Sequence, residues 1–142
     1  MNQSEEKRVG GCRCGGVRYE LKGKPLWVAH CHCSDCRRSV GAPFVTWGGW
    51  RTDAVSWTTI APAPHRSSAG VTRSFCPTCG TPIAFVGERW PGEIHMLIGT
   101  LDDPASVEPR AHTYWSEKLP WIHIGDSLKK FAKTPKEGPA LP

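Results

Sequence analysis

Residues 30–39 read HCHCSDCRRS, a stretch that places three cysteines and two histidines within seven residues. Cysteine sulfur and histidine nitrogen are ligands that zinc commonly binds in proteins. If the first part of this stretch is extended, Cys31 and Cys33 share one face, while His30 and His32 project from the other. The two histidines are then poorly placed to join the cysteines. Three thiolates without a local fourth ligand are typical of a catalytic zinc site that keeps one position open.

The remaining cysteines predict a second site, which is closed. The seven cysteines fall into three clusters: Cys12 and Cys14; Cys31, Cys33 and Cys36; and Cys76 and Cys79. In FCPTCGTP, residues 75–82, the glycine after the second cysteine supplies the positive φ of a zinc knuckle. Cys12 and Cys14 point to the same side of an extended segment and can complete the set. Four thiolates form a closed tetrahedral structural site, which leaves three cysteines for the open one.

The spacing also permits another pairing of the cysteines. Cys33 and Cys36 could join Cys76 and Cys79 in an ordinary zinc ribbon built from two knuckles. The other three cysteines would then be spare. Both divisions of the cysteines are compatible with the residues alone.

The length of the chain and its first residues indicate what class of protein it is and where it is located. A chain of 142 residues fits one domain with a core of its own. The opening residues MNQSEEKR are polar, and no stretch approaches the roughly 20 apolar residues of a membrane span. We therefore expect a cytoplasmic protein without a membrane segment. Seven cysteines in that reducing compartment indicate metal binding rather than disulfides.

The net charge gives little support for a nucleic-acid partner. The formal charge of +5 treats every thiol as neutral. If all the cysteines bind two zinc ions as thiolates, the charge falls to about +2. The lysines and arginines are also dispersed and form no basic stripe with interleaved aromatic residues. We therefore expect no nucleic-acid partner, and the oligomeric state is left open.

The pattern along the chain predicts one mainly β domain over residues 10–132. Short β-favouring runs recur between glycine and proline residues: VRYEL, LWVAH, FVTW, AVSWTTI, VTRSFC, PIAFV and EIHMLIGTL. YWSEKLPW and DSLKKFAK are each expected to form a helical turn or two, and residues 61–70 an exposed loop between two strands. Residues 1–9 are expected to be a flexible N-terminus and residues 133–142 a flexible tail.

Four stretches together resemble a known family. They are GGCRCGGVRYEL, HCHCSDCRRSVGAPF, RSFCPTCGTPIAF and AHTYWSEKLPWIHIGDSLKKF. Their order and the position of every cysteine resemble the glutathione-dependent formaldehyde-activating enzyme family, whose domain is shared with centromere protein V. The resemblance covers about residues 10–131.

The resemblance implies a fold, two metal sites and an activity. The fold would be a zinc-stabilised β-tent of twisted antiparallel sheets with short helical turns. Two zinc ions would bind per chain. The structural ion would be held by Cys12, Cys14, Cys76 and Cys79, and the catalytic ion by Cys31, Cys33 and Cys36. The family's named reaction joins formaldehyde to glutathione to give S-(hydroxymethyl)glutathione, and it is classed as a carbon–sulfur lyase activity.

The leading functional prediction is a zinc-dependent carbon–sulfur lyase that acts on glutathione or a similar small thiol and an aldehyde. The alternative is a non-catalytic zinc-binding module that carries glutathione or docks a protein partner. The two differ in whether the bound thiol reacts.

Three residues near the open site are candidates for contact with the substrate: Arg37, His32 and Phe44. Arg37 directly follows Cys36 and can bind a carboxylate through two hydrogen bonds, unless it is solvated or paired with Asp35. His32 could move a proton or support neighbouring groups. Phe44 could form a wall over the metal or belong to the core.

The sequence assigns no chemical role to the other histidines. His112 and Trp115 stand where the family also has a histidine and an aromatic residue, and the resemblance indicates a pocket wall there. His65, His95 and His123 are expected to be structural or exposed.

Overall fold

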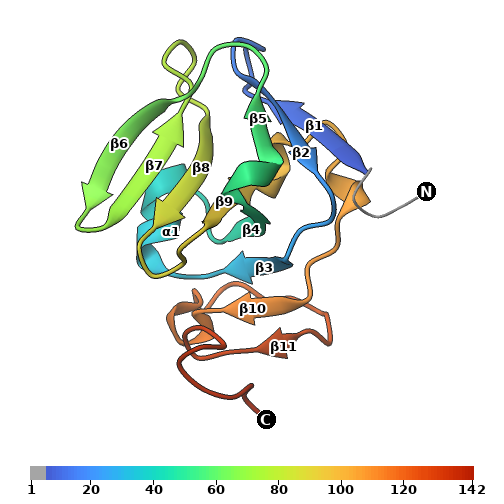
Figure 1. Cartoon of the computed structure of the whole chain (residues 1–142). Coiled ribbons are helices and arrows are strands. Elements are labelled where there is room, and N and C mark those ends of the chain that lie inside the picture. Colours follow the sequence, from blue (N-terminus) through green and yellow to red (C-terminus); the bar gives the residue numbers. More distant parts are fainter. Residues whose placement is uncertain (1–5) are drawn as a thin grey trace. The chain divides into compact units, whose positions relative to one another are not determined.

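The computed structural model describes residues 6–142 of the protein. Its packing divides the chain into two compact units. Unit 1 runs up to Leu26 and resumes over Gly48–Val107, and unit 2 comprises Trp27–Trp47 and Glu108–Pro142. The described residues are mainly β with one short α-helix, which confirms the predicted fold class (Figure 1). Within that part of the chain, no helix is long and apolar enough to cross a membrane.

A three-stranded antiparallel sheet opens unit 1. Its strands, in the order β1-β2-β5, are β1 (Lys7–Gly11), β2 (Arg18–Lys22) and β5 (Val55–Trp57). Tyr19 and Leu21 of β2 are buried, as the alternation of a half-buried strand requires. The hydroxyl of Tyr19 lies 2.7 Å from that of Thr100. The polar end of this core side chain is therefore satisfied.

Four further strands of unit 1 form successive antiparallel pairs in the order β9-β8-β7-β6 (Figure 1). Their bounds are β6 (Ala63–Ser68), β7 (Val71–Phe75), β8 (Pro82–Gly87) and β9 (Glu93–Leu97). Ile83 and Met96 are fully buried in this unit. Gly70 has a φ of 70° in the tight turn between β6 and β7, a conformation that glycine adopts without steric cost.

Strand β6 corrects the loop that was predicted for residues 61–70. Pro64 lies opposite Ser74 of β7, and β6 ends the order of strands. Proline cannot donate a ladder hydrogen bond, so it occurs in strands mainly at sheet edges. The Pro/Ser/Ala composition that predicted a loop is thus compatible with an edge strand.

Unit 2 contains the parallel pairs of the fold. Strand β10 (Ala111–Thr113) pairs in parallel with β3 (Trp27–Cys31) on one side and with β11 (Lys129–Lys130) on the other. These pairs are the exceptions to the expected antiparallel sheets. Strand β4 (Val45–Arg51) follows β3 in the chain and neighbours it in the order of strands. The register aligns His112 of β10 with His30 of β3, and Thr113 with Cys31.

Helix α1 (Ser34–Val40) was not predicted from the sequence. It is a seven-residue helix in which Cys36 is the buried residue, so it has no apolar periodicity to reveal it. Cys33 caps it, because its sulfur accepts a hydrogen bond from the Cys36 N–H. Gly41, with a φ of 69°, ends it in the left-handed conformation typical of a helix C-terminus.

The helical turns and the chain ends differ in part from expectation. The described residues also form short 3₁₀ turns: η2 (Thr52–Ala54), η3 (Ile98–Thr100), η4 (Pro104–Ser106) and η5 (Trp115–Glu117). Turn η5 falls in YWSEKLPW, as predicted, whereas DSLKKFAK contains the two-residue strand β11 and no helical turn. Residues 1–5 of the expected flexible N-terminus lie outside the described residues. Lys7 to Val9 belong to β1, and the Lys133 carbonyl accepts a hydrogen bond from the Tyr114 N–H. A single domain over residues 10–132 stays a prediction.

Candidate metal centres and their surroundings

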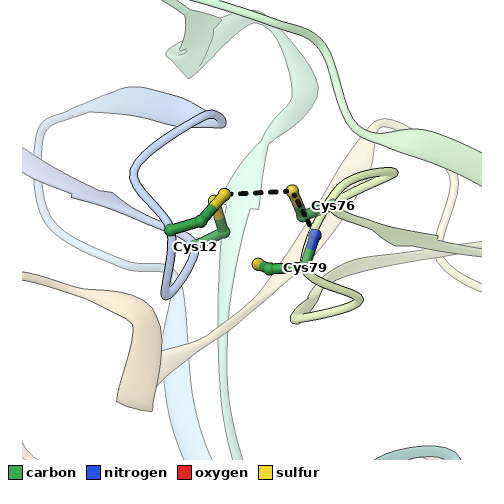
Figure 2. A group of neighbouring side chains, drawn as sticks. Cys12, Cys76 and Cys79 are labelled. Carbon is green, nitrogen blue, oxygen red and sulfur yellow. Dashed lines mark hydrogen bonds between the residues drawn. The ribbon is translucent and has the colours of Figure 1, made fainter.

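Four cysteines of unit 1 converge on one point. The sulfurs of Cys12, Cys14, Cys76 and Cys79 all lie within 4.8 Å of one another. Figure 2 shows Cys12 on one side and Cys76 and Cys79 on the other, with their sulfurs turned toward each other. Cys12 and Cys76 are buried, whereas Cys14 and Cys79 are exposed. The structure thus groups Cys76 and Cys79 with Cys12 and Cys14, as the four-plus-three division requires.

Backbone N–H groups support the sulfurs of this four-cysteine cluster. Val17 donates to Cys12 Sγ at 3.2 Å, and Cys79 donates to Cys76 Sγ at 3.4 Å. Gly15 and Gly80, which follow the second cysteine of each pair, have φ values of 81° and 80°. Their left-handed conformation turns the chain so that N–H groups face sulfur. Such donors stabilise thiolates, and the four sulfurs match the ligand set of a closed structural zinc site.

Of the two exposed sulfurs of this cluster, that of Cys79 loses its proton more readily than an ordinary thiol. Cys79 Sγ lies 3.1 Å from the hydroxyl of Thr81. Hydrogen bonds from the Thr81 hydroxyl and from nearby backbone N–H groups lower the pKa of Cys79 to about 5. A thiolate is the form of cysteine that binds metal.

Three cysteines of unit 2 form a second cluster. Cys31 ends β3, Cys33 caps α1 and Cys36 lies in the first turn of that helix. Their sulfurs all lie within 4.8 Å of one another, and those of Cys31 and Cys36 are 3.7 Å apart. Among residues 6–142, no ligand atom of another cysteine, histidine, aspartate or glutamate joins this group. The three-cysteine cluster therefore offers three ligands and leaves a fourth position to another group.

The sulfurs of the three-cysteine cluster can all be ionised only beside a cation. Hydrogen bonding with the neighbouring sulfurs and burial raise the pKa of Cys31 far above its ordinary value. The pKa of Cys33 is raised to about 11, because the effects of Cys36 and burial outweigh a hydrogen bond from Cys31. Buried sulfurs this close cannot all ionise unless a positive ion compensates them. The donor set thus fits zinc bound by three thiolates.

Two histidines and a carboxylate form a hydrogen-bonded chain beside the three-cysteine cluster. His32 Nε2 lies 2.9 Å from His112 Nδ1, and His112 Nε2 lies 2.9 Å from Asp126 Oδ2. Both histidines are fully buried. The backbone N–H of His32 also donates to the Thr113 carbonyl at 3.1 Å. We call these three residues the His32–His112–Asp126 chain.

The environment fixes the charges at both ends of this chain. Burial raises the pKa of Asp126, but hydrogen bonds from His112 and the Leu128 N–H outweigh it and hold the pKa below its usual range. Burial and the nearby positive charges, Lys118 among them, lower the pKa of His32 to about 4. At neutral pH, Asp126 is therefore a carboxylate and His32 a neutral imidazole.

Aromatic rings enclose the buried histidines. The Phe44 ring lies 5.3 Å from the rings of both His30 and His32. The Trp115 ring lies 5.2 Å from His32 and 4.8 Å from His112. Phe44, which was predicted as a substrate contact, thus packs directly against His32, and Trp115 packs against both His32 and His112.

The residues that follow β10 hold Trp115 in place. Tyr114 has a φ of 51°, a left-handed conformation that is costly for a tyrosine and marks a constrained turn. Just after it, the Glu117 carboxylate accepts a hydrogen bond from the N–H of Ser34, the first residue of α1. The ammonium groups of Lys118 and Lys130 lie 5.4 and 5.1 Å from the Trp115 ring centroid.

A surface cavity lies beside Trp115. It has a volume of about 420 Å³ and is lined by Trp115, Lys118, Ile122, His123, Ile124 and Gly125. His123 is exposed and faces this cavity, and His65 is exposed on β6. His95 is buried, with Nε2 2.9 Å from the Glu93 carboxylate.

Arg37 keeps part of its guanidinium available. Its Nε donates to the His32 carbonyl at 3.4 Å, and no carboxylate in residues 6–142 pairs with it. Asp35, the partner considered from the sequence, is exposed in the first turn of α1. The role of Arg37 in binding substrate stays a prediction.

Sequence reasoning missed Asp126 as a partner of the histidines. The signal was a histidine at position 112 in a short β-favouring segment and a carboxylate fourteen residues later. The parallel pairs align His112 with His30 on one side and with Lys130 on the other, and Asp126 lies in the segment that leads into β11. Parallel pairing leaves no local mark in the sequence comparable to that of a hairpin.

Two comparisons with known proteins gave matches. The model of the family described as glutathione-dependent formaldehyde-activating enzyme matches residues 7–117, which include every cysteine. A crystal structure of a Rhodobacter sphaeroides protein, a Northeast Structural Genomics target, is 25% identical and has a TM-score of 0.57. The alignment covers 72% of this chain and 92% of that one. The chain belongs to the glutathione-dependent formaldehyde-activating enzyme family.

Proposed function

We propose that this protein is a zinc-dependent carbon–sulfur lyase that joins glutathione, or a similar small thiol, to an aldehyde such as formaldehyde. The observation that carries the proposal is the three-cysteine cluster, which has three sulfurs within 4.8 Å and no fourth protein ligand in residues 6–142. An open position distinguishes catalytic from structural zinc sites. Membership of the family supports the same assignment of substrates.

The reaction needs a thiol that is nucleophilic at neutral pH. Zinc held by Cys31, Cys33 and Cys36 would supply a Lewis-acidic centre that favours the ionised form of a thiol. The thiol sulfur attacks the carbonyl carbon, and a carbon–sulfur bond forms. The π electron pair moves to the carbonyl oxygen, which takes up the proton that the thiol released. No redox partner is required, and the reverse sequence cleaves the same bond.

The four-cysteine cluster has a structural role in this proposal. Zinc bound by Cys12, Cys14, Cys76 and Cys79 would have no open position. It would link the segment between β1 and β2 to the knuckle between β7 and β8.

Arg37 is proposed to bind a carboxylate of the thiol substrate. Replacing it with alanine should raise KM for glutathione about 10-fold or more, because a hydrogen bond to a charged group contributes roughly 1.5–3 kcal/mol. The effect on kcat should be small, since a distant carboxylate is bound equally in the ground state and the transition state.

Steady-state kinetics of the Arg37→Ala variant test this role, with Arg38→Ala as the matched control. Arg38 is the exposed neighbour on the same helix. If both variants keep the KM of the unmodified protein, Arg37 does not bind the substrate. If kcat falls while KM is unchanged, its role lies in the chemical step instead.

A non-catalytic zinc module that carries glutathione or docks a protein is the alternative function. It would use the same open position to bind a thiol, but the bound thiol would not react. The two functions are separated by turnover and not by binding.

Anaerobic native mass spectrometry, followed by exchange NMR, tests the proposed function. We expect two zinc ions per chain and the addition of one glutathione. We also expect faster exchange between formaldehyde and its glutathione adduct than in protein-free solution. Glutathione binding with exchange at the protein-free rate would identify a carrier. A single zinc ion, even after zinc is resupplied under reducing conditions, would contradict both readings of the three-cysteine cluster.

A further inference from the structure

One buried nitrogen in the described part of the chain has no hydrogen-bond partner. Among the buried side-chain nitrogens and oxygens, it is Nδ1 of His32, in a side chain that is fully buried. Buried polar atoms in native proteins are nearly always hydrogen-bonded, so an exception calls for an explanation. The other ring nitrogen of His32 is engaged with His112. The question is which kind of group forms a hydrogen bond with Nδ1.

The hydrogen-bonded chain fixes the chemical character of this nitrogen. A carboxylate only accepts hydrogen bonds, so His112 must donate to Asp126 from Nε2. When each imidazole carries one proton, His112 has its lone pair on Nδ1 and accepts a hydrogen bond there from Nε2 of His32. His32 then keeps a lone pair on Nδ1, and in this arrangement the unpartnered atom is an acceptor.

The surroundings of His32 restrict the donor that can reach it. Phe44 and Trp115 pack against the ring and offer no acceptor or donor of their own to Nδ1. Lys118 and Arg37 contribute positive charge nearby, which disfavours a cationic donor such as an ammonium group. A small neutral donor, a hydroxyl or a thiol, fits both conditions.

We propose that Asp126 and His112 are positioning residues that hold His32 in its Nε2–H tautomer, so that Nδ1 accepts a hydrogen bond from a hydroxyl or thiol of the ligand. The identity of that ligand rests on the proposed function, in which the adduct of a thiol and an aldehyde carries a new hydroxyl. The family model matches residues 7–117 and so does not include Asp126. The resemblance noted in the sequence extends past Asp126 but gives that residue no role.

Nitrogen NMR of the zinc-loaded protein, labelled with ¹⁵N-histidine, tests the tautomer directly. Without ligand, we expect His32 to show an unprotonated, pyridine-type Nδ1 and a protonated, pyrrole-type Nε2. The opposite pattern would overturn the proposal. This measurement uses the unmodified protein, so it does not depend on the folding of a variant.

The Asp126→Asn variant tests whether the carboxylate sets the tautomer. An amide can donate as well as accept, so the order of hydrogen bonds is no longer dictated. We expect His32 to lose its single tautomer in this variant and to keep it in Asp126→Glu. The same change at an exposed carboxylate, Asp103→Asn, should leave the His32 signals unchanged. Unchanged His32 signals in a folded Asp126→Asn protein would contradict the positioning role.

A pair of stable glutathione derivatives tests the contact with ligand. S-(2-hydroxyethyl)glutathione carries a hydroxyl, and S-propylglutathione replaces it with a methyl group. We expect only the first to shift the His32 Nδ1 signal toward that of a hydrogen-bonded acceptor. Equal shifts with both bound derivatives, or none, would overturn the contact.

Failure of both derivatives and of glutathione to bind would have a different meaning. That result would refute the proposed function, and the ligand contact with it. The tautomer measured without ligand would still decide whether Asp126 and His112 position His32. The two failures are therefore distinguishable.

Discussion

The Cys76→Ser variant is expected to lose the zinc of the four-cysteine cluster and to be largely unfolded at 25 °C. Cys76 is 1% exposed, and its sulfur accepts hydrogen bonds from the N–H groups of Thr78 and Cys79. Structural zinc contributes about 10–16 kcal/mol in zinc-finger peptides, whereas a whole domain is stable by only about 5–15 kcal/mol. Serine oxygen is a poor replacement for a soft thiolate ligand. The loss is therefore comparable to the total stability of the fold.

Zinc stoichiometry and circular dichroism melting measure this effect, with Thr78→Ala as the control. Thr78 lies in the same knuckle, but only its backbone N–H contacts the cluster, and its side chain is exposed. The control should keep both zinc ions and the melting temperature of the unmodified protein. A chelator added to the unmodified protein should reproduce the unfolding. A Cys76→Ser protein with two zinc ions and an unchanged melting transition would show that the four-cysteine cluster does not hold a structural metal.

Local spacing predicted which neighbouring cysteines act together, but it left two divisions of the cysteines open, and the family resemblance favoured the one that the structure shows. In each pair of the four-cysteine cluster, two cysteines are followed by glycine, and the chain geometry within five residues turns both sulfurs to one side. Cys31 at the end of β3 and Cys33 two residues later are also near neighbours in the chain, and their sulfurs lie close together. The mainly β fold class followed from short β-favouring runs between turn residues. These features depend on residues that are near each other in the chain.

Pairing between distant segments could not be predicted from the sequence. To predict the contact between His112 and His32, one must know the register of β10 against β3, which aligns His112 with His30. Strand β10 has three residues, too few to show alternation of polar and apolar side chains. Helix α1 was missed for a similar reason, because its boundaries are set by a cysteine cap and by Gly41 and not by an apolar face. The surroundings of the three-cysteine cluster therefore emerged only from the structure.

The Cys33→Ser variant is expected to fold, to bind one zinc ion and to lose glutathione binding. Cys33 caps α1, and serine is a favoured N-cap residue, so the helix should be retained. The four-cysteine cluster contains no residue of α1 and should keep its metal. Metal assistance contributes several kcal/mol to a barrier of this kind, and each 1.4 kcal/mol is tenfold in rate, so kcat/KM should fall by about 1,000-fold or more.

The contrast between Cys33→Ser and Cys76→Ser separates a catalytic from a structural cluster. If the division is right, Cys33→Ser loses turnover but keeps a cooperative melting transition, whereas Cys76→Ser loses both. Ser39→Ala serves as the control on α1, since Ser39 is exposed and its hydroxyl donates only to the Asp35 carbonyl. That variant should keep both zinc ions and full activity. If Cys33→Ser unfolds as completely as Cys76→Ser, the three-cysteine cluster is needed for the fold, and its open position would no longer by itself argue for catalysis.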